Sequence, residues 1–230
     1  MPITMLVTGA NRGIGLELVR QAAARGDDVI ATARHAGEAV DLQALSGGRA
    51  EVAVHGADVT DPVGLAAIAH EERRAVDLVV CNAGHFAARG DIEDAAYTPD
   101  TWRDELMTNV AGPFFTVRAF LPNLMKSAAP KVAVISSVMG SSTRAKGDAY
   151  GYRASKAAAC NLALNLAADL RPRGIAVGCY HPGWVRTDMG GQRADIAAED
   201  SAAGLLARFD ALSLERSGCF ENHLGETIPF

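Results

Sequence analysis

The sequence predicts an α/β protein of the doubly wound type, in which one seven-stranded parallel sheet carries helices on both faces. Short apolar runs of strand length alternate with longer segments of helical periodicity, which is the pattern of repeated βαβ units. The chain has 230 residues and shows neither an internal repeat nor a shift in composition. We therefore expect residues 1–230 to form a single domain with its own hydrophobic core.

Seven apolar runs have the length of strands. In a parallel sheet both faces are covered, so its strands are expected to be apolar throughout. The strands are expected near residues 3–8, 28–33, 50–55, 76–81, 131–136, 175–180 and 217–221.

The helices between these strands have recognisable ends. The first is expected to begin near Asn11 and to run to Ala24, because Gly26 is a favourable C-terminal stop. The second opens at Thr60-Asp61-Pro62, where threonine can cap the helix and proline suits its first turn. The second helix and three further ones are expected over residues 60–73, 99–126, 150–171 and 199–210.

The composition argues against several classes of partner. The formal net charge is −5, and Lys and Arg form no runs, so we expect no nucleic-acid partner. The chain reaches a glycine-rich turn at Thr8 and contains no apolar run of membrane-spanning length, which predicts a cytoplasmic protein without a membrane segment. Free thiols and no metal are expected, because no metal-ligand spacing joins Cys81, Cys160, Cys179 and Cys219.

The glycine-rich turn directly follows the first expected strand. Glycine lets the backbone turn sharply and approach a pyrophosphate, whose charge is stabilised by free N–H groups and by the dipole of the following helix. The spacing Gly-x-x-x-Gly-x-Gly differs from the general Gly-x-Gly-x-x-Gly fingerprint, but its strand–turn–helix context indicates a dinucleotide site of Rossmann type. The residues expected to bind there are Gly9, Asn11, Arg12, Gly13, Ile14 and Gly15.

The end of the second strand indicates which dinucleotide binds. An NAD site is expected to carry a carboxylate for the ribose 2′-hydroxyl, whereas this chain has Arg34. A guanidinium pairs with the 2′-phosphate of NADP, and Arg12 in the turn can reinforce it. The cofactor that we predict is NADP(H), with NAD(H) as the less favoured alternative.

Tyr152 and Lys156 are the catalytic pair that the sequence predicts. They lie four residues apart at the start of a helix, hence on one face and within mutual reach. Tyrosine ordinarily has a pKa of about 10, and a nearby ammonium lowers it, so that the phenol can serve as an acid or base. Strand 131–136 ends at Ser136 and Ser137, where a hydroxyl can polarise a substrate carbonyl.

Further motifs follow one another in order along nearly the entire chain. They are Thr8-Gly-x-x-x-Gly-x-Gly15, Asp58-Val59, Asn82-Ala-Gly84, Asn109, Ser137, Tyr152-x-x-x-Lys156 and Pro182-Gly-x-x-x-Thr187. Taken together, these motifs resemble those of the short-chain dehydrogenase/reductase family. Within the family, the Tyr152–Ala158, His181–Met189 and Ser217–Phe220 segments look like the branch of C-factor and sniffer-type carbonyl reductases.

The resemblance implies further cofactor contacts beyond the glycine-rich turn. These are Asp58 and Val59 beside the adenine, Asn82, Ala83 and Gly84 under the cofactor, and Pro182, Gly183, Val185 and Thr187 at the nicotinamide.

The resemblance also assigns the chemistry. Ser137 would orient the substrate oxygen, Tyr152 would transfer its proton, and Lys156 would bind the nicotinamide ribose. The carbonyl of Asn109 would hold a water in a proton relay toward Lys156. Pro113 supports this last role independently, because its missing N–H leaves that carbonyl without its helical partner and bends the helix.

Two positions depart from the family pattern. Cys81 stands where relatives usually have asparagine, which we interpret as a packing change. The interval from Ser137 to the tyrosine is 15 residues, which is longer than usual. Ser136 therefore remains an alternative to Ser137, with Ser141 and Ser142 as weaker ones.

The substrate pocket is expected to be open. Only a short glycine-rich segment follows Thr187 before the next expected helix, so little chain is left for a lid. The side chains expected near the pocket are Phe86, Met139, Arg144, Trp184 and Met189.

The predicted function is transfer of hydride between NADP(H) and a small carbonyl or alcohol substrate, with Tyr152 as general acid or base. One alternative is an NAD-dependent alcohol dehydrogenase of the same family. Another is a cofactor-binding signalling protein of the C-factor type. In relatives the tyrosine-bearing helix often pairs between subunits, which favours a homodimer.

Overall fold

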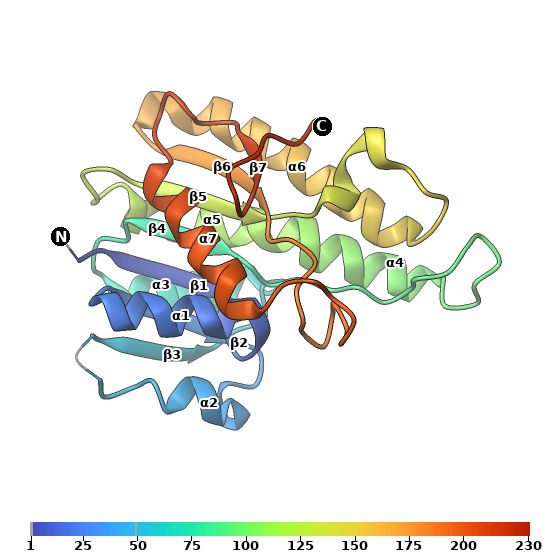
Figure 1. Ribbon diagram of the computed structural model, residues 1–230. Coiled ribbons are helices and arrows are strands. Elements are labelled where there is room, and N and C mark those ends of the chain that lie inside the picture. The colour runs from blue at the N-terminus through green and yellow to red at the C-terminus, as the bar shows by residue number, and fades with distance from the viewer. Residues whose placement is uncertain (1, 49) are drawn as a thin grey trace.

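A computed structural model describes residues 2–48 and 50–230 and contains one seven-stranded sheet (Figure 1). The strands are β1 (Thr4–Thr8), β2 (Asp28–Ala33), β3 (Val52–Gly56), β4 (Leu78–Cys81), β5 (Lys131–Ile135), β6 (Ala176–His181) and β7 (Phe220–Asn222). Their order is β3-β2-β1-β4-β5-β6-β7, and each neighbouring pair is parallel. The predicted fold class is confirmed.

Helices cover both faces of the sheet. They are α1 (Gly13–Arg25), α2 (Val40–Gln43), α3 (Pro62–Glu72), α4 (Pro99–Leu106), α5 (Gly112–Leu124), α6 (Tyr150–Leu170) and α7 (Ala198–Ala211). Helices α1 and α7 pack together on one face, and α3, α5 and α6 cover the other (Figure 1). Among the described residues, no helix is both long and apolar enough to cross a lipid bilayer.

Alternate residues of the strands belong to two separate apolar layers, one on each face of the sheet. On β1, Leu6 belongs to the layer under α3, α5 and α6, whereas Met5 and Val7 belong to the layer under α1 and α7. Ile30 and Ala31 divide in the same way on β2. Since successive side chains of a strand point to opposite faces, a sheet covered on both sides requires unbroken apolar strands.

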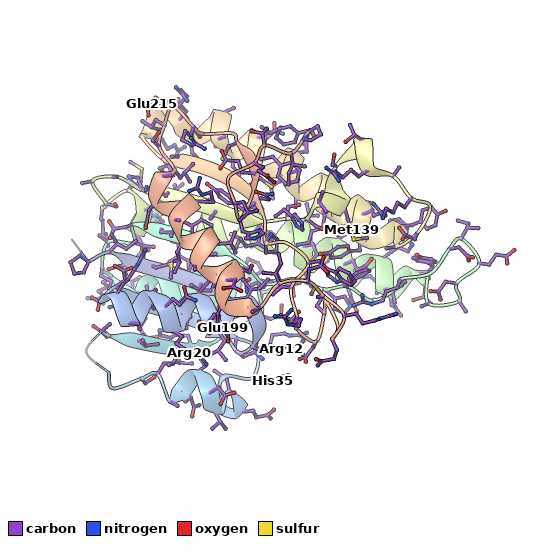
Figure 2. All side chains as sticks on the ribbon, in the orientation of Figure 1. Arg12, Arg20, His35, Met139, Glu199 and Glu215 are labelled. Carbon is purple, nitrogen blue, oxygen red and sulfur yellow. The ribbon has the colours of Figure 1, made fainter. Side chains whose placement is uncertain are left out.

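The strand order reverses at β1, which lies between β2 and β4. Chains leaving β1 and β4 enter helices on opposite faces, so the loops diverge and open a crevice at the carboxyl ends of these strands. Figure 2 shows Arg12 and Met139 at this edge of the sheet, with Glu215 toward the opposite edge. The crevice is where the predicted site residues converge.

The helix ends agree with most of the expected signals. Gly26 follows α1 in the left-handed conformation, with φ of 93°, as its role as a stop requires. At α3, however, the expected cap is wrong: Asp61, not Thr60, caps the helix by accepting from the Val63 N–H. Thr60 instead donates both its N–H and its hydroxyl to Asp58.

The helix expected over residues 99–126 is not continuous. A π-helical turn, Met107–Ala111, separates α4 from α5, and the Gly112 N–H bonds to the Met107 carbonyl five residues back. Pro113 supplies the reason, because it cannot donate the α-helical hydrogen bond to Asn109. The predicted local effect of this proline therefore takes the form of a wider turn.

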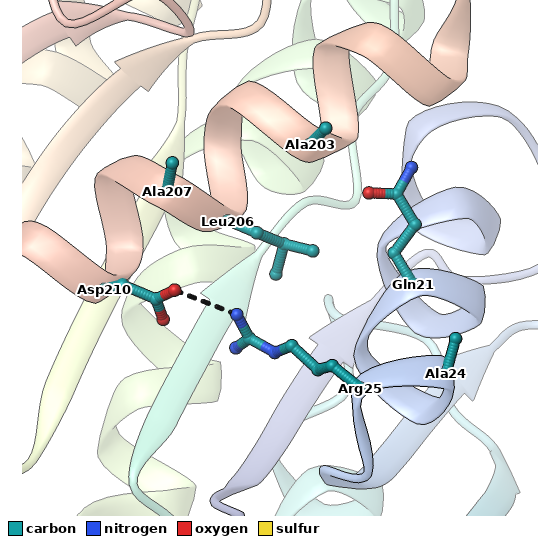
Figure 3. Close-up of a pocket in the computed structure, with 7 residues that line it drawn as sticks. All are labelled: Gln21, Ala24, Arg25, Ala203, Leu206, Ala207 and Asp210. Atoms are coloured by element: carbon teal, nitrogen blue, oxygen red, sulfur yellow. Dashed lines mark hydrogen bonds and ion pairs between the residues drawn. The ribbon is translucent and has the colours of Figure 1, made fainter.

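A depression of about 540 Å³ lies between α1 and α7 (Figure 3). Ala24 and Ala203 leave space there, and the Arg25 guanidinium reaches across to Asp210 at 2.9 Å. Because α1 and α7 cover the face of the sheet opposite α6, this depression is separate from the crevice that receives Tyr152.

Gly140, in the turn that follows β5, lies close to the backbone of α6 and allows a testable prediction. An added Cβ there would lie 2.6 Å from the carbonyl carbon of Lys156 and 2.7 Å from its oxygen, and backbone cannot move aside cheaply. We expect Gly140→Ala to lower the free energy of unfolding by about 1–3 kcal/mol in urea denaturation. The control is Gly56→Ala, whose Cβ would meet nothing within 4 Å; its change should stay within about 0.5 kcal/mol. Equal effects would contradict the packing argument.

Candidate active site

The phosphate-binding turn is shaped by close backbone contacts. Gly9 and Gly13 adopt positive φ angles of 64° and 55°. A Cβ on Gly9 would lie 2.8 Å from Ala83 Cα, and one on Gly15 would overlap the Gly9 carbonyl oxygen. Helix α1 has neither a side-chain cap nor an acidic residue in its first turn. Its free N–H groups and the bare glycine surface therefore fit a pyrophosphate.

Asn82 connects the end of β4 to this turn. Its Nδ2 donates to the carbonyls of Thr8, at 2.9 Å, and Gly9, at 3.1 Å. The Thr8 hydroxyl in turn accepts from the N–H groups of Asn82 and Ala83, both at 3.1 Å. These bonds fix the two strand ends on either side of the crevice.

The residues expected at the adenosine end lie around the rim of the crevice. Arg34 is exposed directly after β2 and forms no ion pair with the described residues. Arg12 is also exposed, but its Nη1 lies 2.7 Å from Asp188 Oδ2. Asp58 Oδ1 accepts from the N–H and hydroxyl of Thr60, at 2.8 and 2.7 Å. Arg34 thus presents a free guanidinium, whereas Arg12 must leave a carboxylate before it can bind a phosphate.

Three other predicted cofactor residues have different surroundings. Asn11 is exposed, and Ile14 is half-buried against the layer under α1 and α7. Val59 is buried, and a Cβ on Gly112 would lie 2.8 Å from its Cγ2. Val59 therefore packs against the start of α5, next to the π-helical turn.

Tyr152 and Lys156 are both buried on α6, at 7% and 4% exposure. The Lys156 Nζ lies 5.6 Å from the centroid of the tyrosine ring and donates to the Ile135 carbonyl at 2.9 Å. Burial lowers the pKa of Lys156 to about 8, because it disfavours the ammonium. The pair that the sequence predicted is thus brought together at the end of β5.

The expected effect of Lys156 on the tyrosine differs from what the structure shows. Burial dominates and raises the pKa of Tyr152 to about 12, and the carboxylate of Glu105 acts in the same direction. A hydrogen bond with Ser137 and the charge of Arg89 oppose the rise. With this pKa Tyr152 is a neutral phenol at pH 7 and holds a proton to donate.

Ser137, rather than Ser136, faces the tyrosine. The hydrogen bond with Ser137 is one of the influences on the pKa of Tyr152. Ser136 Oγ instead donates to the Lys156 carbonyl at 2.9 Å and so ties β5 to α6. Ser141 pairs with a neighbouring threonine hydroxyl at 2.8 Å. Ser136 and Ser141 thus have other partners, whereas the Ser137 hydroxyl acts on the phenol of Tyr152.

Asn109, in the π-helical turn, joins the loop after β4 to α6. Its Oδ1 accepts from the His85 N–H, and its Nδ2 donates to the His85 carbonyl and to Ser155 Oγ, each at 2.8 Å. The Ser155 hydroxyl in turn donates to the Tyr152 carbonyl, also at 2.8 Å. The wide turn therefore places this side chain as a brace for the tyrosine.

Gly84 lies at the centre of these groups. A Cβ there would be 3.5 Å from Asn109 Oδ1 and 3.6 Å from Lys156 Nζ. The floor of the crevice is thus formed by Gly84, Asn109 and Lys156, which come from the loop after β4, the π-helical turn and α6.

The segment after β6 is fixed at its start. The Pro182 carbonyl accepts from Ser201 of α7 at 2.7 Å, and Gly183 has a φ of 92°. Val185 is buried and forms a parallel bridge with Ile196. This anchoring positions the residues that the family resemblance places at the nicotinamide.

The same segment then crosses the phosphate-binding turn. A Cβ on Gly13 would lie 3.1 Å from Thr187 Cγ2, and Asp188 pairs with Arg12. The Trp184 indole N–H donates to the Gly190 carbonyl at 2.9 Å. Although short and glycine-rich, this segment is therefore held by side chains from both ends of the crevice.

Several residues of the site carry no local sequence signal. Phe86, expected only near the pocket, stacks on Tyr152 with centroids 4.0 Å apart and an interplanar angle of 15°. The Arg89 guanidinium lies 4.0 Å from the Phe86 centroid. Buried Glu105 accepts from the Ala87 N–H at 2.8 Å and so shapes this loop. Only tertiary contacts reveal Arg89 and Glu105 as neighbours of the tyrosine.

An open pocket of about 480 Å³ adjoins this loop. Of the five side chains expected near the substrate, two line it, Trp184 and Met189, and three do not, Phe86, Met139 and Arg144. Among the described residues, no cluster of His, Cys, Asp or Glu could hold a metal ion. The complete lining is Arg89, Trp184, Asp188, Met189, Gly190, Gly191, Gln192 and Arg193.

Comparisons with known proteins identify the family of the chain. A family model for short chain dehydrogenases matches residues 3–197. C-signal of Myxococcus xanthus is 39% identical over 161 residues, which cover 67% of this chain and 93% of that protein. The carbonyl reductase Sniffer of D. melanogaster superposes with a TM-score of 0.94 at 26% identity, and a carbonyl reductase from chicken fatty liver with NADPH bound superposes with a TM-score of 0.90 at 32% identity. Both structures are covered completely and cover this chain completely.

The family model spans the phosphate-binding turn, the Tyr152–Lys156 pair and the segment after β6. The C-signal and Sniffer matches confirm the branch that the sequence indicated. The chain belongs to the short-chain dehydrogenase/reductase family and is an oxidoreductase of that family.

Proposed function

We propose that this protein is an NADP(H)-dependent reductase of small carbonyl compounds, with the reverse oxidation of alcohols using the same groups. The observation that carries the proposal is the placement of a protonated Tyr152, with Ser137 beside it, at the edge of the sheet that also bears the phosphate-binding turn. The exposed guanidinium of Arg34 supports NADP(H) over NAD(H). The chicken carbonyl reductase, with NADPH bound, supports the same choice.

Different residues around the crevice would bind different parts of NADP(H). The turn from Gly9 to Gly15 would hold the pyrophosphate, and Arg34 would hold the 2′-phosphate. Thr187 and Val185 would lie at the nicotinamide, which when bound supplies hydride to the carbonyl carbon.

Tyr152 donates its phenolic proton to the substrate oxygen as negative charge develops there. Ser137 donates a hydrogen bond to the same oxygen and fixes its position. Lys156 still carries its proton at neutral pH, since its pKa is about 8, and its ammonium stabilises the phenolate left by the transfer. Asn109 holds Tyr152 in place through Ser155.

A second candidate is a cofactor-binding signalling protein, which the similarity to C-signal favours. In such a protein the crevice would bind NADPH, but turnover would not be the function. The presence of Tyr152, Ser137 and Lys156 in one buried group argues for catalysis. Exposed apolar side chains on α4 and α5, Trp102, Leu106 and Phe114, support a homodimer in either case.

The first prediction from the proposed function concerns the proton donor. Tyr152→Phe should lower kcat for aldehyde reduction by about 100-fold or more, because the acid is removed while the aromatic packing remains. NADPH binding, measured by fluorescence titration, should stay nearly unchanged. Tyr150→Phe on the same helix is the control and should keep its activity. If Tyr152→Phe retained activity, Tyr152 would not be the proton donor.

The signalling alternative is tested on the unmodified protein. NADPH binding without any turnover in a screen of aldehydes, ketones and alcohols would favour it.

The second prediction concerns cofactor choice. Arg34→Asp should weaken NADPH binding by roughly 10- to 100-fold, because a charge-assisted hydrogen bond is replaced by repulsion of the 2′-phosphate. NADH, which lacks that phosphate, should bind with little change and serves as the internal control. Unchanged NADPH affinity would show that Arg34 does not select the cofactor.

The third prediction concerns pH and the buried lysine. In the folded protein the pKa of Lys156 is about 8, against an ordinary value of 10.5 in the unfolded chain. Between these values the unfolded chain binds more protons, so this group makes the protein more stable as pH rises. Urea denaturation between about pH 7 and 10 should therefore show the unmodified protein gaining stability relative to Lys156→Met. Parallel pH profiles for the two proteins would contradict burial of an ionisable lysine.

A further inference from the structure

Three stacked groups extend from Tyr152 toward the open pocket. The Phe86 ring lies 4.0 Å from the Tyr152 ring and nearly parallel to it, so one face of Phe86 is fully used. The Arg89 guanidinium also lies 4.0 Å from the Phe86 centroid and must therefore occupy the opposite face. This order places a permanent positive charge on the far side of the Phe86 ring from the phenol.

Arg89 is exposed, but two contacts orient its guanidinium. Besides its contact with Phe86, its Nη2 donates to the Met189 carbonyl at 2.6 Å. Among the described residues no carboxylate forms an ion pair with it. Since a guanidinium has five N–H donors in a rigid fork, donors remain for a planar anion. A group fixed in this way loses little freedom when it binds one.

The charges around the pocket point the same way. Arg89 and Arg193 both line it, and its single carboxylate, Asp188, is paired with Arg12. The indole of Trp184, 52% exposed, adds an apolar wall. The pocket therefore offers uncompensated positive charge and one aromatic surface, the complement of an anion attached to an apolar body.

We propose that the substrate is a carbonyl compound with a carboxylate, which Arg89 binds in this pocket while the carbonyl lies at Tyr152. The inference rests on the proposed function, because the second point of attachment is the catalytic phenol. The stacked arrangement places the two sites on opposite sides of the Phe86 ring, with a stacking distance of 4.0 Å on each side. A spacer such as one benzene ring joins a carbonyl and a carboxylate over a distance of this order.

Arg89 also bears on the electrostatics of the phenol. Its charge lowers the pKa of Tyr152. A bound carboxylate would partly neutralise that charge and so raise the pKa of the phenol again. Binding of the anion and the acidity of Tyr152 are thus linked through one side chain.

The test compares para-formylbenzoate with its methyl ester, which has the same carbonyl but no charge. Dissociation constants are measured by calorimetry on the NADP⁺-loaded protein, and kcat/KM is measured with NADPH. We expect the unmodified protein to favour the carboxylate by about tenfold or more in both measurements. Arg89→Met should bring the ratio close to one, and Arg89→Lys should restore part of it. Arg118→Met, which removes an exposed arginine that lies over other aromatic rings, is the control and should keep the original ratio.

The ratio separates recognition from general damage. A loss of packing around Tyr152 would slow both compounds alike and leave their ratio unchanged, which would overturn the inference. Equal binding of the two compounds by the unmodified protein, or binding of neither, would also overturn it. If the carboxylate were preferred in binding through Arg89 but neither compound were reduced, the anion site would stand and the proposed function would fall.

Discussion

The hydrogen bonds between Asn82 and the end of β1 hold together the point at which the strand order reverses. On one side of this point the chain forms the glycine-rich turn and enters α1. On the other side, the chain after β4 passes Gly84 and carries the loop that stacks on Tyr152. If these strand ends moved apart, the phosphate-binding surface and the acid would no longer face one crevice. The site therefore depends on the register of two parallel strands.

Burial then sets the chemistry of the catalytic groups. Removal of water favours the neutral forms of both side chains, which raises the pKa of Tyr152 and lowers that of Lys156. The phenol consequently starts as a proton donor, and the lysine remains able to carry charge near neutral pH. Asn109 fixes the loop after β4 beside these groups, because its amide satisfies both the N–H and the carbonyl of His85.

The substrate side of the crevice is built by long-range contacts. Arg12 meets Asp188 and Arg89 meets the Met189 carbonyl, so both sides of the crevice hold one short segment after β6. The same guanidinium of Arg89 stacks on Phe86 and lowers the pKa of the tyrosine. Two arginines thus connect three parts of the crevice. Arg12 links the phosphate-binding turn to the segment after β6, and Arg89 links that segment to the loop that stacks on Tyr152.

The amino-acid sequence was sufficient to predict the parallel sheet, the position of the phosphate-binding turn, and the pairing of Tyr152 with Lys156. These features depend on local patterns: apolar runs covered on both faces, glycines between a strand and a helix, and a spacing of four on a helix. The surroundings of the phenol, by contrast, are visible only in the folded protein: Ser137 faces it, and the charges of Arg89 and Glu105 act on it. Those outcomes depend on burial and on contacts between residues far apart in the chain, for which local spacing has no signal.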